Sequence, residues 1–226
     1  MLKYCLFFLL TISAVFSGRA QTHYSSNVCV GGRAGVDMSM VSFSPSVKQV
    51  WPVNPILGIG VRYIEENHFG LIAELNWVRR GWKENFEGLD YHYRRNLDYI
   101  EIPVFAHIYF GKQAKFFVNA GPQIAFRLSQ SYSANFDPYA TASLPGFPNS
   151  NRRNEQLTMD VTQKVDYGIA AGIGCEYNIN PTNSVSLEAR YYFGLGNIMP
   201  SARSDTFRAS NMMYVAVTAG YWFRIK

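Results

Sequence analysis

The stretch Phe116-Phe117-Val118-Asn119-Ala120-Gly121-Pro122-Gln123-Ile124-Ala125-Phe126-Arg127-Leu128 decides the fold. One set of alternate positions reads Phe, Val, Ala, Pro, Ile, Phe and Leu, and the other reads Phe, Asn, Gly, Gln, Ala and Arg. This period of two is typical of a β-strand with one apolar face. Roughly eight such stretches follow the first twenty residues, which predicts an all-β fold, an eight-stranded antiparallel up-and-down meander closed as a transmembrane barrel.

Residues 1–20 are expected to be a secretory signal peptide, which leaves residues 21–226 as one barrel domain. The chain begins Met1-Leu2-Lys3, continues through an apolar segment over 6–16, and reaches the small residues of Ser17-Gly18-Arg19-Ala20. The apolar segment is about half the length that a membrane helix needs. Cleavage after Ala20 is therefore the prediction, and an uncleaved anchor is the alternative.

Composition indicates that water does not cover the whole surface. Charged residues make up 16% of the chain, against about 25% in ordinary soluble domains, and aromatic residues reach 15%. No later segment is a continuous apolar helix of spanning length, so a barrel is the expected membrane structure. A soluble lipocalin-like ligand carrier is the structural rival, but its exterior would be rich in Gly and Ala and poorly solvated.

The charge balance supports no strong electrostatic partner. Without the two basic residues of the expected signal, the net charge of +5 falls to +3, and no basic run points to nucleic acid. The pairs Arg79-Arg80, Arg94-Arg95 and Arg152-Arg153 fall in or beside expected long loops. Contact with acidic lipid head groups or surface sugars is one interpretation of these pairs, and solubility of exposed loops is the other.

The alternation places strands at 28–37, 55–64, 69–80, 97–110, 115–128, 165–179, 185–196 and 212–225. Links 65–68, 111–114 and 180–184 consist of turn-forming residues and are expected to be tight turns. The other links, 38–54, 81–96, 129–164 and 197–211, are long and polar. Short turns at one end and long loops at the other are how outer-membrane barrels are built, with both termini on the periplasmic side.

The faces of these strands sort into an aliphatic exterior and a polar interior. The interior of an eight-stranded barrel is just wide enough for side chains to fill it. We therefore expect a polar network in the lumen, either as a structural salt-bridge network or as a proton or ion path. Its members are Arg62, Glu74, Glu101, Arg127, Asp166, Glu176, Glu188 and Arg190.

Aromatic residues near strand ends are expected to form the girdles that meet lipid head groups. They are Tyr63, Trp77, Phe110, Phe116, Tyr177, Phe193 and Phe223. The last strand, with Tyr221-Trp222-Phe223, is similar to the terminal signal that the barrel assembly machinery reads, although Arg224-Ile225-Lys226 follows the aromatic residues. Outer-membrane lipid and the assembly machinery are the expected partners.

Several motifs in order resemble the PorT-type outer-membrane β-barrel family of Bacteroidota, which includes OmpX-like, porin-family barrels. They are Leu97-Asp98-Tyr99-Ile100-Glu101-Ile102-Pro103, Gly121-Pro122-Gln123, Leu187-Glu188-Ala189-Arg190-Tyr191, Gly194-Leu195-Gly196-Asn197 and Gly220-Tyr221-Trp222-Phe223. The resemblance covers essentially the whole mature chain. It implies an eight-stranded barrel in the cell outer membrane.

Catalysis has little support in the sequence. His107 and Glu101 are six residues apart on one expected strand, about 20 Å, so they cannot touch. No metal-ligand spacing or cofactor motif is present, so we expect no enzyme, metal or cofactor. Cys29 should point inward and Cys175 outward on strands that are not neighbours, which predicts two free thiols.

The expected function therefore rests on the loops. Loop 129–164 carries aromatic residues flanked by Pro and Gly, which can form a surface for a protein or glycan partner, or equally a packed lid. The leading hypothesis is a non-enzymatic outer-membrane barrel that displays long extracellular loops for surface interaction or envelope integrity. A narrow porin-like pore for ions or small solutes is the alternative, beside the soluble carrier.

Overall fold

The computed structural model describes residues 26–149, 152–202 and 205–225, and the expected signal peptide lies outside them. Eight long strands occur in this part of the chain, with one short strand, one 3-10 turn η1 (Thr141–Ser143) and one helical turn α2 (Glu155–Thr158). The strands are β1 (Asn27–Ser44), β2 (Gln49–Val50), β3 (Val53–Glu66), β4 (Phe69–Glu84), β5 (Tyr93–Gly111), β6 (Ala114–Ala134), β7 (Val165–Asn178), β8 (Asn183–Asn197) and β9 (Ala209–Arg224).

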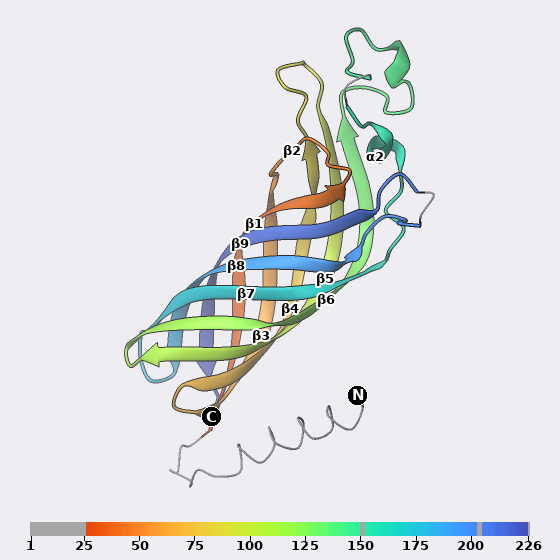
Figure 1. Cartoon of the computed structure of the whole chain (residues 1–226). Helices are drawn as coiled ribbons and strands as arrows, with labels where there is room; N and C mark the ends of the chain where they lie inside the picture. Colours follow the sequence, from red (N-terminus) through yellow and green to blue (C-terminus); the bar gives the residue numbers. More distant parts are fainter. Residues whose placement is uncertain (1–25, 150–151, 203–204, 226) are drawn as a thin grey trace, which may run out of the picture.

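The eight long strands form a closed ring, as Figure 1 shows. Each pairs antiparallel with its neighbour in the chain, and β1 pairs with β9 from Cys29↔Arg224 to Ser44↔Ala209. Closure removes the two sheet edges that an open meander would leave unpaired. The predicted all-β, eight-stranded meander is confirmed, and the two-residue β2 adds a short pairing to the end of β4.

The two faces of the strands divide as the alternation predicts. On β3, Ile59 is 64% exposed, whereas Arg62 is 3% exposed and points into the barrel. The same division runs around the ring, with aliphatic and aromatic side chains outside and charged, polar and aromatic side chains inside. The expected assignment of faces is therefore correct, including Cys29 inside and Cys175 outside as free thiols.

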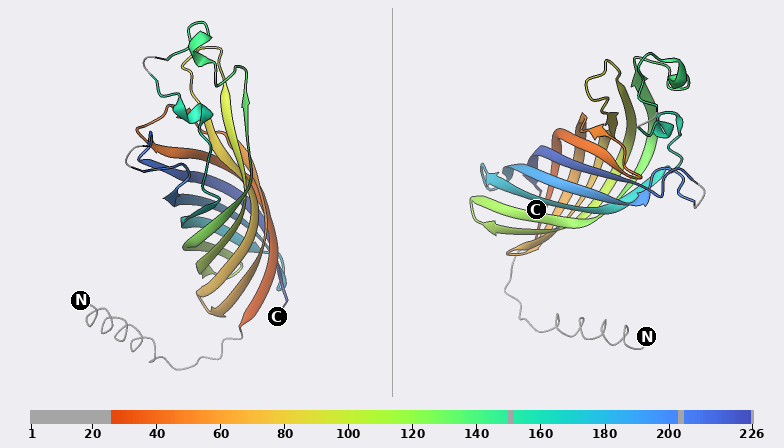
Figure 2. Two further views of the ribbon diagram at one scale, coloured as in Figure 1. Left: turned by 90° about the vertical axis from the view of Figure 1, so that its right-hand side faces the viewer. Right: turned by 45° about the horizontal axis from the view of Figure 1, so that its top comes forward.

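The two ends of the barrel differ in build (Figure 2). Tight turns join β3 to β4, β5 to β6 and β7 to β8 at one end, where β1 also begins and β9 ends. We call this the turn end and the opposite one the loop end. None of the helices in the described ranges is long and apolar enough to cross a membrane.

The strands extend further toward the loop end than the sequence predicts. Expected loops 81–96 and 129–164 shorten because β5 and β6 remain paired from Asp98↔Ser129 up to Tyr93↔Ala134. Expected loop 38–54 shortens because β1 runs to Ser44 beside β9. On β5 and β6 the outer faces of the extensions are polar, so the apolar alternation that marks a membrane strand stops before the strand does.

Candidate functional site

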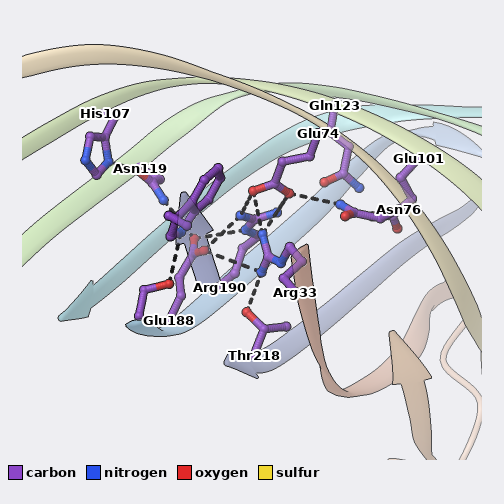
Figure 3. A network of polar contacts seen from close by, with 12 residues as sticks. Arg33, Glu74, Asn76, Glu101, His107, Asn119, Gln123, Glu188, Arg190 and Thr218 are labelled. Atoms are coloured by element: carbon purple, nitrogen blue, oxygen red, sulfur yellow. Dashed lines mark hydrogen bonds and ion pairs between the residues drawn. The ribbon is translucent and has the colours of Figure 1, made fainter. Parts of the chain in front are cut away.

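The middle of the lumen holds a cluster of four charged side chains (Figure 3). Arg190 donates to both oxygens of Glu74 at 2.8 and 2.9 Å and to Glu188 at 2.9 and 3.0 Å. Arg33 donates to Glu74 at 2.6 Å and lies 3.4 Å from Glu188. The Arg190 guanidinium also stacks 4.3 Å over the ring of Phe105. Two cations and two anions thus neutralise one another away from water.

Glycines on the inner face make room for this cluster. A Cβ atom on Gly58 would lie 1.8 Å from the Asn76 side-chain oxygen, and one on Gly172 would lie 2.4 Å from a Glu188 oxygen. Asn76 in turn donates to Glu74 at 3.0 Å. The small residues of one strand are therefore matched to the long polar residues of its neighbour.

A second charged pair closes the turn end of the lumen. Arg62 donates to Glu176, and its guanidinium lies 4.7 Å from the ring of Trp222. Lys115 adds a second cation 3.6 Å from Glu176. The cavity beside these residues, which Cys29 also lines, measures about 10 Å³. That is at most the space of a single water molecule.

A third charged group lies on the loop side of the middle cluster. Arg80 is fully buried and forms ion pairs with Glu101 and, at 3.1 Å, with Asp166. Three tyrosine rings surround its guanidinium at 4.5 to 5.2 Å. Cation–π contacts of this kind stabilise a desolvated arginine. The rings belong to Tyr99, Tyr192 and Tyr214.

An apolar plug covers the polar layers at the loop end. Phe43 packs edge-on against Trp82 with ring centroids 5.5 Å apart and against Phe207 at 4.8 Å. Val161 and Met199, from the links that follow β6 and β8, join the same buried cluster. Segments outside the strands therefore turn back into the mouth of the barrel and close it.

The outer face carries an apolar band that stops abruptly toward the loop end. On β5 the outward residues are apolar from Phe110 to Ile100, and the next one is Asp98. Ten residues span about 34 Å along a strand, or about 26 Å along the axis of a barrel with strands tilted by about 40°. This height matches the apolar band of about 25 Å that faces lipid in outer-membrane barrels.

The comparison with protein families agrees with this geometry. Residues 19–199 match the family described as outer membrane protein beta-barrel domain. The chain belongs to that family. This outer-membrane barrel is located in the cell outer membrane, and the soluble carrier is excluded because the aliphatic face of the barrel lies outside.

Two solved structures are similar to this chain at low sequence identity, and OprG, with the TM-score above 0.5, supports the fold. The outer membrane protein OprG from Pseudomonas aeruginosa is 11% identical, with 88% of this chain and 95% of that chain covered and a TM-score of 0.51. Neisserial surface protein A is 15% identical, with 88% and 99% covered and a TM-score of 0.49. No curated protein matches the sequence.

Seven of the eight predicted network residues are buried in the lumen of this outer-membrane barrel, where they contact other polar side chains. The exception is Arg127, which is half-exposed and donates to Gln130 at 2.9 Å and to the Val161 carbonyl. Arg127 contacts the plug residue Val161 and none of the predicted acids, because the pairing of β6 with β7 ends one residue earlier, at Phe126↔Val165, next to a register shift opposite Asp98 and Tyr99. The residues placed in the lumen are Arg62, Glu74, Glu101, Asp166, Glu176, Glu188 and Arg190.

Two essential cations of the network, Arg33 and Arg80, are absent from the prediction. Arg33 lies four residues after the inward Cys29 and therefore on the same face of β1, so the alternation could have predicted that it points into the lumen. Arg80 is interpreted from sequence as part of an exposed arginine pair. That interpretation is wrong for one member of each pair, because Arg80, Arg95 and the Arg152 side chain are buried.

The seven predicted girdle residues lie on the outer face, all exposed except the half-buried Trp77. Trp77 and Phe193 lie toward the loop end, and the other five lie near the turn end. The latter are Tyr63, Phe110, Phe116, Tyr177 and Phe223. Two separated groups are the arrangement that a bilayer with two interfaces requires.

Beyond the apolar band, an aromatic cluster packs on the extended ends of β4, β5 and β6. Phe86 contacts Tyr91, Phe136 and Phe147 with ring centroids 5.6 to 6.0 Å apart. Arg152 lies 4.2 Å over the Phe86 ring. Part of the predicted loop 129–164 is thus a packed surface layer, which we call the loop-end cluster.

One buried carboxylate fastens the loop-end cluster to β4. Glu84 accepts from Arg152, from Gln156 at 3.1 Å and from the Trp82 indole at 3.1 Å. Burial raises the pKa of the Glu84 carboxyl, while Arg152 and the two hydrogen bonds oppose this effect. The ionised carboxylate therefore depends on Arg152 at its side.

Proposed function

We propose that this protein is a non-enzymatic outer-membrane barrel that holds a folded interaction surface outside the cell, for a protein or a glycan. The observation that carries the proposal is the contrast between the two parts of the molecule. The lumen is filled from end to end, whereas the loop end is built out as an ordered layer of strands and aromatic residues.

The filled lumen argues against the pore alternative. The Arg62 pair, the Arg190 cluster, the Arg80 group and the apolar plug lie one above another across the barrel. Ion conduction would require water throughout this path, and each buried pair is held by contacts that water would have to replace. The network is better interpreted as the structural filling of the barrel.

An open strand edge gives the loop end a means of binding an extended polypeptide. From Ser129 to Ala134, β6 pairs with β5 on one side, and no described strand pairs with its other side. Two other edges at the loop end are covered, one on β1 and one on β4. The Gln49 side chain donates to the Val41 carbonyl at 2.8 Å and accepts from its N–H, and β2 pairs with β4. Unpaired edges are used for β-strand addition in protein recognition.

The histidine in the lumen supports a non-enzymatic role. His107 is 2% exposed, and its Nδ1 lies 2.7 Å from the Asn119 side-chain oxygen. Its ring stacks on Tyr109. Its burial and these contacts leave almost no surface of the imidazole for a substrate to touch. Envelope integrity, the assembly machinery as a partner of β9 and the finer PorT-type assignment stay predictions.

Two measurements test the proposal. In planar bilayers, the purified protein should give no conductance steps, and reproducible steps would exclude a filled lumen. For the loop end, Phe86→Ser/Phe147→Ser should reduce adhesion of expressing cells to other cells or to immobilised glycans. The matched control is Phe110→Ser/Phe116→Ser at the turn end, which should leave adhesion unchanged. Equal adhesion of all three proteins would refute the role of the loop-end cluster.

A further inference from the structure

The part of β6 that rises above β7 has one open side (Figure 1). β6 pairs with β7 only as far as Phe126, and one residue later the Arg127 N–H donates to the Lys164 carbonyl at 2.8 Å. From Ser129 to Ala134 the pairing with β5 continues on the other side. This segment is therefore the edge of a sheet, and we call it the β6 edge.

Hydrogen bonding shows which backbone groups of the β6 edge face its open side. In antiparallel strands, the peptide groups of successive residues point alternately to one neighbour and to the other. The Asn135 N–H donates to the His92 carbonyl at 3.3 Å, toward β5, and the register runs without a break from there to Ser129. The open side therefore carries the N–H and C=O groups of Gln130, Tyr132 and Ala134. None of the residues that the structure describes bonds to these groups.

The sequence of the β6 edge does not protect it against pairing with another chain. Natural edge strands are usually blunted by charged side chains, by proline or by a cover. The residues from Ser129 to Ala134 include no charged residue and no proline, and all of them except Ala134 are exposed. The edges of β1 and β4 at the same end are covered. The β6 edge is thus able to accept a further strand.

The pattern of open groups matches a second copy of the same edge. The groups are arranged symmetrically about Tyr132, so antiparallel pairing of two copies places Tyr132 opposite Tyr132 and Gln130 opposite Ala134. The three N–H groups of each copy then meet the three carbonyls of the other, and every open group is paired. No like charges meet, and the two tyrosine side chains become cross-strand neighbours, which stabilises a pair of strands.

The tilt of the strands decides where the second copy lies. Strands of outer-membrane barrels are tilted by about 40° from the barrel axis. The β6 strands of two copies related by a two-fold axis along the membrane normal would thus cross at about 80°, whereas neighbouring strands of a sheet differ by only about 20–25°. Antiparallel pairing requires the second copy to be inverted, with its turn end pointing away from the first membrane. Such a contact joins two membranes, loop end to loop end.

We propose that copies of this protein on facing outer membranes bind each other through antiparallel pairing of their β6 edges. The inference rests on the proposed function, in which the loop end is an interaction surface, and it names a second copy of this chain as the protein partner. Each contact is small, and many copies on each membrane add their contacts.

The first test is clustering of phosphatidylcholine vesicles that carry the purified protein, followed by turbidity. Wild-type vesicles should cluster, and Gln130→Pro should weaken clustering about tenfold because each copy loses one of its open N–H donors. Gln130→Ala is the matched control, since it also loses the contact of the side chain with Arg127 but keeps the N–H. It should cluster within about twofold of wild type. Slower gel migration on boiling confirms that each variant is folded.

The second test exchanges charges at the centre of the paired edges. Tyr132→Lys vesicles should not cluster with one another, nor should Tyr132→Glu vesicles, because like charges then face each other directly. A mixture of the two should cluster, because each contact then joins opposite charges. This recovery is expected only if residue 132 of one copy faces residue 132 of the other.

Other outcomes would overturn the proposal. Equal clustering by Gln130→Pro and Gln130→Ala would show that the backbone of the β6 edge is not used, and no clustering in the charge mixture would exclude the pairing about Tyr132. Wild-type vesicles that stay apart would exclude pairing between copies altogether. The proposed function is judged separately, by the adhesion of cells that express Phe86→Ser/Phe147→Ser, and a loss of adhesion there would then point to a partner other than this chain.

Discussion

Replacing Arg190 by leucine should destabilise the barrel by about 3–5 kcal/mol. Arg190 is 1% exposed and forms ion pairs with both Glu74 and Glu188. After the substitution, Arg33 alone faces the two carboxylates, at 2.6 and 3.4 Å. One buried negative charge is then unbalanced. Leaving a buried charge without its partner destabilises a protein by about 3–5 kcal/mol, and an apolar replacement side chain does not offset this.

A second substitution should restore much of the lost stability. In Arg190→Leu/Glu188→Gln, the remaining charges are Arg33 and Glu74, which form a neutral pair through two donor–acceptor contacts of 2.6 and 2.7 Å. The side-chain oxygen of the introduced glutamine can still accept from Asn119, which donates to Glu188 at 3.2 Å in the wild type. The double variant should therefore lose only about 1–2 kcal/mol, because both partners of the Arg190–Glu188 pair are replaced together and no buried charge is left unbalanced.

The assay is urea unfolding of the protein in lipid vesicles, followed through the fluorescence of its four tryptophans. The result that supports the reasoning is a double variant more stable than the single one, since charge balance then decides the stability of the lumen. If Arg190→Leu costs less than about 1 kcal/mol, or if the double variant is the less stable of the two, water hydrates the cluster and the lumen is not packed as described.

Three further predictions concern other parts of the molecule. Arg152→Gln should lower the free energy of opening of the loop-end cluster by about 3 kcal/mol. Proteolysis near Leu157 on intact cells should then be faster, with no change in heat-modifiable migration. Unchanged proteolysis would contradict this. Ile173→Lys, within the apolar band, should cost about 2–4 kcal/mol in urea unfolding, and Phe116→Lys, at the turn end, about 0–1; equal costs would mean that the band is misplaced. Cys175 should react with a lipid-soluble maleimide and not with a membrane-impermeant one, and the opposite preference would place it in water.

The wall of the barrel could be predicted from sequence because one physical rule governs it. Outward residues face lipid along each spanning strand, so the apolar period of two marks both the strand and its face. The tight turns follow from residues such as Asn180, Pro181 and Asn183. The lumen network was largely within reach for the same reason, since Glu74 and Glu101 stand out as charges in apolar strands.

The strands of the loop end could not be predicted from sequence, because outward residues are no longer apolar once the strand has left the lipid. From Asp98 to Arg94 and from Ser129 to Ser133, the outer face is polar, and the local sequence is that of a loop. The pairing of β5 with β6 continues because the inner face of β5 is still buried, with Tyr93 0% exposed and stacked on the half-exposed Tyr132 at 5.8 Å. Such a strand alternates between polar outward residues and aromatic inward residues. Because it has no apolar outer face, its sequence resembles that of a polar loop.

The extended strands also decide where the adjacent arginines of each pair lie. Two adjacent residues of a strand point to opposite faces, so Arg79-Arg80 cannot be two exposed residues once β4 continues past them. Arg80 enters the lumen, where Glu101 and Asp166 balance it, and Arg79 stays outside with Asp98. The same division sends Arg95 inward and leaves Arg94 outside, opposite Lys83. In both pairs the inward arginine is part of the buried network of the barrel, and the outward one stays on the outer face of the wall.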